Sequence, residues 1–153
     1  MKQTDDKVGG RLGLAQQLCF ALYSTSHAFT RAYKPLLAPL GLTYPQYLVM
    51  LVLWEEEDVT VKEIGARLQL DSGTLTPLLK RLDAAGLVTR ARDSGDERQV
   101  RVLLTEAGHA LRARAEEIPK RLAEAIGEPL TAIVALRNQL TEIRDRIGAV
   151  GAD

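Results

Sequence analysis

The residues of this chain best suited to redox chemistry are one cysteine and three tyrosines. Cys19 is the only cysteine, and a thiolate at this position is the form that a peroxide attacks. Phenolic hydroxyls stabilise a thiolate by hydrogen bonding, and Tyr23, Tyr33 and Tyr44 are the candidate donors. The alternative is that Cys19 is inert and packs as a small buried hydrophobe, as free cysteines often do.

The spacing of these residues limits which of them can meet. On one helix, Tyr23 lies about 40° to one side of Cys19 and Tyr33 lies about 40° to the other, so the three share a face. The rise along the axis is about 6 Å from Cys19 to Tyr23 but about 21 Å from Cys19 to Tyr33. We therefore expect Tyr33 to reach the thiol only if the helix breaks or if another subunit supplies the tyrosine.

A second group of residues has the character of a DNA-binding surface. A helix is predicted to begin after Asp71 or Ser72, and hydroxyl side chains near its N-terminus can meet phosphates and base edges. Two basic residues follow in the later turns and are suited to the phosphate backbone. The candidates on this helix are Ser72, Thr74, Thr76, Lys80 and Arg81.

The hairpin predicted after this helix is rich in charge. Its basic residues are Arg90, Arg92, Arg98 and Arg101, and its acidic residues are Asp93, Asp96 and Glu97. We expect the acids to orient the arginines, and Arg98, near the tip, is suited to a narrow minor groove. Arg90, Asp96 and Arg98 are the candidates for DNA contact.

Composition excludes several other classes of protein. The 153 residues suit one domain, and 46% hydrophobic with 26% charged residues is ordinary globular composition. The 20 basic and 20 acidic residues cancel, so any DNA affinity must come from a local patch. A single cysteine forms no internal disulfide, and two histidines, His27 and His109, do not suffice for a zinc site. We expect neither a structural metal nor a cofactor.

Nothing in the sequence predicts a membrane or secreted protein. The longest apolar run, Tyr47 to Trp54, is far shorter than a membrane span, and the N-terminal MKQTDDKVGGR lacks an apolar signal segment. We expect a cytoplasmic protein without a membrane partner.

Helical periodicity and capping motifs predict the elements of the first two thirds of the chain. A leucine-rich stripe from Leu14 to Leu40 indicates a helix that Pro35, Pro39 and Gly41 interrupt. Two capping boxes open the next helices: Thr43 with Gln46, after which the helix runs to about Glu56, and Thr60 with Glu63, after which it runs to about Gln69. The inward positions of the third helix, which ends at Gly86, are Leu75, Leu78, Leu79 and Leu82.

The remaining residues predict a hairpin and two more helices. Strands are expected at 87–92 and 99–104, around a turn at 93–96. Thr105 caps the next helix, which Pro119 interrupts and which stops near Gly127. The last helix spans about Pro129 to Ile147 and has a broad apolar face.

This layout is that of a winged helix-turn-helix flanked by extra helices. We predict a mainly α fold with a small β-wing, in which residues 1–153 form one compact unit. Residues 43–104 form the winged helix-turn-helix module that binds DNA. Residues 11–42 and 105–148 form helices with unpaired apolar faces, and two chains would most economically bury these faces in a dimerisation bundle.

Several sequence segments resemble a known family. The segments LDAAGLVTR (82–90), DER (96–98) and LTEAG (104–108) resemble the MarR family of dimeric winged-helix transcription regulators. More specific segments resemble its organic hydroperoxide resistance regulator branch: QLCFALY (17–23), YKPLL (33–37), LTYPQY (42–47) and LDSGTLTPLLKR (70–81). The resemblance runs from about Gln16 to Ile118.

The resemblance implies specific roles. It implies a homodimeric repressor that leaves its operator DNA when an organic hydroperoxide oxidises Cys19. In the reduced state the thiol would be hydrogen-bonded by Tyr33 and Tyr44 from the partner subunit. Residues 72–81 would enter the major groove, and Arg98 would read the minor groove beside the wing. Some members of the branch carry a second, resolving cysteine, which this chain lacks. The sulfenic acid formed at Cys19 is therefore expected to be captured by a small cellular thiol, to close on a backbone nitrogen, or to be overoxidised.

Two other readings stay open on sequence alone. A cysteine-dependent peroxidase would use the same activated thiol, although it would leave the block from Thr60 to Leu103 without a role. A MarR-type repressor that senses a small aromatic ligand between its domains would leave Cys19 inert. A Cys19→Ser variant separates ligand sensing, which survives the change, from thiol sensing, which does not.

Overall fold

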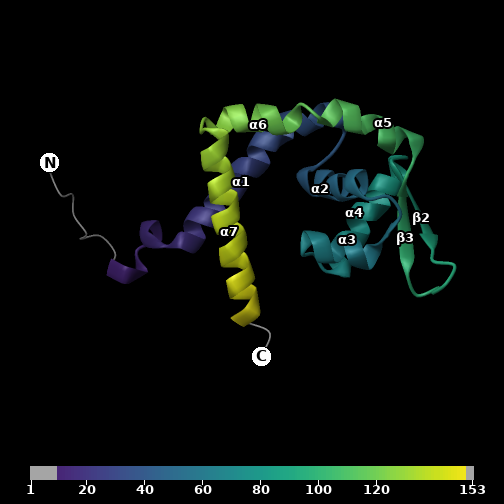
Figure 1. The fold of residues 1–153 in the computed structure, drawn as a ribbon, viewed down its shortest axis with the longest axis horizontal. Helices are drawn as coiled ribbons and strands as arrows, with labels where there is room; N and C mark the ends of the chain where they lie inside the picture. The colour runs from purple at the N-terminus through teal and green to yellow at the C-terminus, as the bar shows by residue number, and fades with distance from the viewer. Residues whose placement is uncertain (1–9, 151–153) are drawn as a thin grey trace. The chain divides into compact units, whose positions relative to one another are not determined.

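Seven α-helices and one three-stranded sheet form the described residues, 10–150, of the computed structural model (Figure 1). The helices are α1 Leu18–Leu37, α2 Tyr44–Glu55, α3 Val61–Leu68, α4 Ser72–Ala84, α5 Glu106–Ala115, α6 Ile118–Ile126 and α7 Leu130–Val150. The strands are β1 Val59–Thr60, β2 Val88–Arg92 and β3 Val100–Leu104. The chain divides into two compact units, Met1–Arg112 and Ala113–Asp153. The predicted mainly α fold with a small β-wing is confirmed.

Local capping chemistry sets where α2 and α3 begin. The Thr43 hydroxyl accepts a hydrogen bond from the Gln46 backbone N–H, while the Gln46 side chain accepts one from the Thr43 N–H at 3.0 Å. Thr60 and Glu63 repeat the arrangement at the start of α3, with 2.7 Å from the Thr60 N–H to the carboxylate. Both predicted capping boxes are therefore confirmed, and each satisfies backbone donors that a helix start leaves free.

The core of the first unit is built around α2, which packs against α1, α3 and α4. Val49, Met50 and Leu53 are fully buried on α2. The four leucines predicted to face inward on α4 are all buried. Trp54, at the end of α2, donates its indole N–H to the Gly108 carbonyl of α5 at 3.0 Å, which ties the helical core to the segment after the sheet.

The sheet has the order β1-β3-β2, and both pairings are antiparallel. The hairpin of β2 and β3 pairs Val88 with Leu104 and Arg92 with Val100, as predicted. Strand β1 was not predicted, because it is two residues long and its partner β3 lies far along the sequence. It adds a third strand by pairing Val59 with Val102.

The prolines act differently from the sequence expectation. Helix α1 continues through Pro35 and is followed by a 3-10 turn, Ala38–Leu40, which ends at Gly41 with φ +68°. Burial of Leu37, which is 1% exposed, offsets the backbone hydrogen bond that Pro35 cannot donate. The expected helical start near Leu14 is also wrong, because a 3-10 turn covers Leu14–Gln16 and α1 begins at Leu18.

The second unit contains α6 and α7. The break predicted at Pro119 falls at residues 116–117, and Pro119 instead lies in the first turn of α6, where a missing N–H costs nothing. Gly127, with φ +74°, ends α6 as predicted. Helix α7 buries none of its residues within the chain. In the described part of the chain no single helix has both the length and the apolarity to cross a membrane, and the one pair that would suffice together, Leu18–Leu40 with Tyr44–Glu55, is bent by 67°.

Candidate functional site

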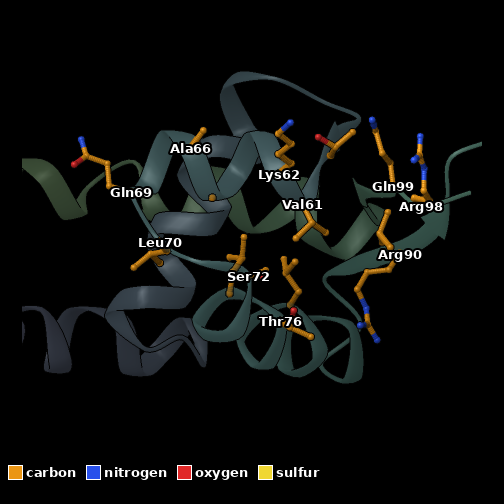
Figure 2. A pocket seen from close by; sticks show the side chains of 15 residues that line it. Val61, Lys62, Ala66, Gln69, Leu70, Ser72, Thr76, Arg90, Arg98 and Gln99 are labelled. Atoms are coloured by element: carbon orange, nitrogen blue, oxygen red, sulfur yellow. The ribbon is translucent and has the colours of Figure 1, made fainter. Parts of the chain in front are cut away.

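A hollow of about 540 Å³ lies between α3, α4 and the hairpin of the first unit (Figure 2). Its polar lining includes Ser72 and Thr76 from α4 and Arg90 and Arg98 from the hairpin. Its apolar lining includes Val61, Leu70, Leu75, Leu79 and Val100. Half of the eight residues predicted to contact DNA therefore gather around one concave surface, although they come from two elements.

The remaining predicted residues of α4 lie outside the hollow. Asp71 is the N-cap, and its carboxylate accepts from the Thr74 N–H at 2.8 Å and from the Thr74 hydroxyl at 3.3 Å. These hydrogen bonds lower the pKa of Asp71 below its ordinary value. The Thr74 hydroxyl is thus engaged in the cap. Lys80 and Arg81 are exposed on the later turns of α4.

An ion pair joins α4 to the hairpin. The Arg90 Nε donates to Asp83 Oδ2 at 2.9 Å. This contact fixes the guanidinium of Arg90 near the end of α4, at the edge of the hollow.

The turn of the hairpin holds Arg98 through one carboxylate. Asp96 accepts from the Arg98 backbone N–H at 3.1 Å, from its Nε at 3.0 Å and from its Nη2 at 3.3 Å. These bonds lower the pKa of Asp96 below its ordinary value. The Arg98 side chain is nevertheless 90% exposed. The predicted orientation of an arginine by an acid is present here.

Arg101 is a residue whose role the sequence reasoning missed. The sequence presents Arg101 only as part of the hairpin charge, whereas in the structure its guanidinium bonds both Asp58 and Asp93. The contact with Asp58 depends on β1, which was not predicted. A local sequence signal for this bridge does not exist, because Asp58 lies far from Arg101 along the chain.

The thiol of Cys19 is exposed near the start of α1. The inert alternative requires a thiol that is buried in the core of this chain, and the structure does not bury it there. Tyr23, one turn later, contacts His27 with ring centroids 4.2 Å apart. Because α1 is continuous from Leu18 to Leu37, Tyr33 lies about 21 Å farther along the axis. The helix does not break between Cys19 and Tyr33, so Tyr33 cannot reach the thiol of its own chain in this manner.

Tyr33 and Tyr44, which the sequence singled out, do lie together. Their ring centroids are 4.6 Å apart, and Tyr47 joins them at 5.8 Å from Tyr33. Burial, with the neighbouring phenols Tyr44 and Tyr47, raises the pKa of Tyr33 to about 12, and burial also raises the pKa of Tyr44. Both phenols are therefore protonated donors at neutral pH. Tyr47 was missed because it sits in an apolar run; its spacing one turn after Tyr44 was the available signal.

A metal centre finds no support in the described residues, which contain no group of three or more His, Cys, Asp or Glu side chains able to hold an ion.

Comparison with known proteins places these sites in context. A family model described as transcriptional regulator SarA/Rot matches residues 31–114. The chain is 56% identical over 106 residues to the organic hydroperoxide resistance transcriptional regulator of Bacillus subtilis, an alignment that covers 69% of this chain and 72% of that protein. It is also 56% identical over 136 residues to the HTH-type transcriptional regulator TtmR of Methylorubrum extorquens, covering 89% and 70% respectively.

A solved structure extends the similarity to three dimensions. Reduced AbfR bound to DNA is 39% identical to this chain and superposes with a TM-score of 0.75, covering 88% of this chain and 94% of AbfR. AbfR comes from Staphylococcus epidermidis. These relatives are transcription regulators rather than enzymes, which agrees with the winged-helix module of the first unit.

Proposed function

Because this chain belongs to the MarR family of winged-helix transcription regulators, in its organic hydroperoxide resistance branch, we propose that it is a repressor released from DNA by oxidation of Cys19. The same membership makes it a regulator and not a peroxidase. The class of function is inferred from the family, whereas the operator contacts and the sensor are inferred from the residues of this chain.

The DNA-binding part of the proposal rests on the concave surface between α3, α4 and the hairpin. Ser72 and Thr76 line it from α4, and Arg90 and Arg98 line it from the hairpin. A helix with exposed hydroxyls at its N-terminus suits the major groove, while an exposed arginine beside it suits the minor groove. Thr74, Lys80 and Arg81 would add phosphate contacts from the rest of α4, and Asp96 would act by orienting Arg98.

The sensing part of the proposal is carried by one observation: Cys19 is exposed on the unbroken helix α1, about 21 Å along the axis from Tyr33. The phenols of Tyr33 and Tyr44 are paired and protonated, and so able to donate hydrogen bonds to a thiolate. We propose that a second copy of the chain brings its own pair to Cys19, with Tyr23 as a neighbour from the same helix.

A homodimer also accounts for the apolar surface of the two long helices. Leu14 and Leu18 are about 60% exposed near the start of α1, and Leu130 and Ile147 are about 70% exposed on α7. Such surface is unfavourable in water and marks a contact with another protein surface. A dimer would also present two copies of α4 to successive turns of operator DNA.

The chemistry of the proposed switch needs only the peroxide and a thiol. The Cys19 thiolate attacks the terminal oxygen of an organic hydroperoxide and the O–O bond breaks, so that a sulfenic acid forms on Cys19 while the departing alkoxide takes a proton from water and leaves as an alcohol. A small cellular thiol then condenses with the sulfenic acid, which releases water and forms a mixed disulfide. No second cysteine exists in the chain to take that step. The added bulk at the subunit junction would displace the DNA-binding modules from their register on the operator.

A gel shift with DNA from upstream of the coding sequence tests the proposal. Reduced wild-type protein should bind, and cumene hydroperoxide should release it. The Cys19→Ser variant should bind equally well and stay bound after the same treatment. Release of Cys19→Ser by the hydroperoxide overturns thiol sensing, and release of that variant by a small aromatic acid alone would support the ligand-sensing alternative.

Intact mass measures the fate of the thiol. After hydroperoxide and a small thiol, wild-type protein should gain the mass of one mixed disulfide on Cys19. Non-reducing gels should show no dimer linked through a resolving cysteine.

A further inference from the structure

The side chain of Arg101 joins two segments that lie far apart in the sequence. Its Nε donates to Asp58 Oδ1 at 2.6 Å, and its Nη2 donates to the Asp58 main-chain carbonyl at 2.7 Å. Its Nη1 donates to Asp93 Oδ2 at 2.8 Å. One guanidinium therefore connects the turn before β1 to the turn of the hairpin, which uses the planar fork of arginine in a way that a lysine cannot reproduce.

The position of Arg101 on the central strand makes this bridge geometrically fixed. Its backbone lies opposite Thr60 on β1 and opposite Ala91 on β2. Asp58 precedes β1 in the left-handed conformation, with φ +60°, a backbone state that a residue other than glycine adopts at a cost. Three hydrogen bonds to two segments compensate for that cost, and together they hold the hairpin turn relative to β1.

The second oxygen of Asp93 shapes the hairpin turn itself. Asp93 Oδ1 accepts from the Gly95 N–H at 2.7 Å and from the Asp96 N–H at 3.0 Å. The hydrogen bond from Arg101 is the largest cause of the lowered pKa of Asp93, and the ionised carboxylate accepts from the guanidinium with one oxygen and from both amides with the other. One oxygen of the Asp93 carboxylate is thus held by Arg101, and the other oxygen holds the backbone of Gly95 and Asp96.

Asp96 in turn holds the guanidinium of Arg98 through Nε and Nη2. Because Arg98 is 90% exposed, nothing in the core determines its direction, and a free arginine would sample many rotamers. The ordered path that ends at Arg98 begins at Asp58 and passes through Arg101, Asp93 and Asp96. Every link in that path is a charge-assisted hydrogen bond or a carboxylate bond to a backbone amide.

We propose that Arg101 is a positioning residue for DNA recognition, which holds the hairpin turn so that Arg98 points in one direction before the DNA arrives. It acts through Arg98 and not by its own contact with the DNA. Pre-orientation of this kind raises affinity by lowering the entropy lost on binding. The inference rests on the proposed function, in which Arg98 contacts the operator.

A double-mutant cycle separates this role from a purely structural or electrostatic one. Operator affinity is measured by fluorescence anisotropy for the wild type, Arg98→Ala, Arg101→Gln and the double variant. Each single change should weaken binding about tenfold, the scale of one good base-region contact. The double variant should bind no more weakly than Arg98→Ala alone, because Arg101 has nothing to position once Arg98 is gone. If the double variant loses affinity by the product of the two single fold-changes, the inference is overturned.

Two further variants control for charge and folding. Arg101→Lys keeps the charge but not the fork, and it should lose most of the affinity that Arg101→Gln loses; full affinity in Arg101→Lys shows a charge effect and overturns the inference. Arg112→Gln removes one positive charge from an exposed site on α5 and should change affinity less than twofold. Thermal unfolding shows whether each variant is folded. If Arg101→Gln does not fold, Arg101→Lys takes its place in the double-mutant cycle.

The outcomes distinguish the inference from the function on which it rests. If Arg98→Ala binds the operator as the wild type does, then the proposed minor-groove contact is wrong. If Arg98→Ala binds weakly while Arg101→Gln and Arg101→Lys bind normally, the contact stands and only the positioning role of Arg101 is overturned.

Discussion

The ring of Tyr33 lies 4.6 Å from the ring of Tyr44, centroid to centroid, with an angle of 30° between their planes. One tyrosine belongs to the later part of α1 and the other is the first residue of α2. The chain bends by 67° between Leu18–Leu40 and Tyr44–Glu55, at the turn that ends at Gly41, and two residues from different helices present their phenols together. Their raised pKa values keep both hydroxyls protonated and able to donate.

Replacing both tyrosines by phenylalanine should slow oxidation of Cys19 at neutral pH. In the proposed dimer the two hydroxyls stabilise the thiolate, so their removal raises the pKa of the thiol and lowers its ionised fraction. The rate of reaction with an organic hydroperoxide, measured across pH, should approach that of the wild type as the pH nears the raised pKa. Operator affinity of the reduced variant serves as the control and should change little. An unchanged rate at neutral pH would contradict the assigned role of the pair.

The stability of the protein should depend on the phenol of Tyr33 in alkali. The pKa of Tyr33 rises from an ordinary 10.0 to about 12 through burial and through Tyr44 and Tyr47. The folded state therefore holds this proton more tightly than the unfolded state, and the resulting stability is complete below pH 10 and is lost as the pH rises through 12. Tyr33→Phe lacks the proton, so its free energy of unfolding should fall less between pH 10 and 12. Denaturant titrations at several pH values measure this, and equal slopes for the two proteins would contradict it.

Gly108→Ala should lower the free energy of unfolding by about 1 to 3 kcal/mol. A Cβ at this position would lie 2.2 Å from the Leu87 carbonyl oxygen and 3.0 Å from Leu104, so the start of α5 must move away from the sheet. Gly148→Ala is the matched control, since its Cβ meets nothing within 4 Å and it lies in α7. That change should stabilise the helix by about 0.5 to 1 kcal/mol. Urea titration gives both values, and equal effects would refute the steric argument.

The protein should sediment as a dimer at micromolar concentration, with twice the 16.8 kDa of one chain. Leu136→Glu places a charge on α7, where the leucine is 56% exposed in the single chain, and should shift the protein toward monomer. Leu103→Glu, on β3 and 37% exposed, is the control and should remain dimeric. A well-folded wild-type monomer at this concentration would contradict the proposed dimer and the proposed contact of Tyr33 and Tyr44 with Cys19 of the other subunit.

Sequence reasoning succeeded where the determining interactions are local. The capping boxes at Thr43 and Thr60 predicted the starts of α2 and α3 because each joins residues three positions apart. The turn after Arg92 and the leucine face of α4 were predictable for the same reason. These local signals were sufficient to identify the winged helix and four of the residues that line its hollow: Ser72, Thr76, Arg90 and Arg98.

The errors arose where distant residues decide the structure. Strand β1 exists because Val59 pairs with Val102, which no local pattern encodes. The bridge from Arg101 to Asp58 follows from that pairing, so it was missed with it. Helix α1 continues past Pro35 because Leu37 is buried by the rest of the fold. In each case a contact across the fold outweighed the local preference.

Trp54 is the only tryptophan of the chain, and its hydrogen bond to the Gly108 carbonyl gives the protein a built-in optical reporter. Light absorbed selectively by indole excites this single site, between the end of α2 and the start of α5. Indole emission shifts in wavelength and intensity when its N–H loses a partner or when its ring meets water. The ring of Tyr47 lies 6.3 Å from the ring of Trp54, centroid to centroid, so the same fluorophore also borders the tyrosine cluster. A change in this environment during the proposed oxidation of Cys19 would thus be seen in unlabelled protein in real time, with no dye attached near the thiol.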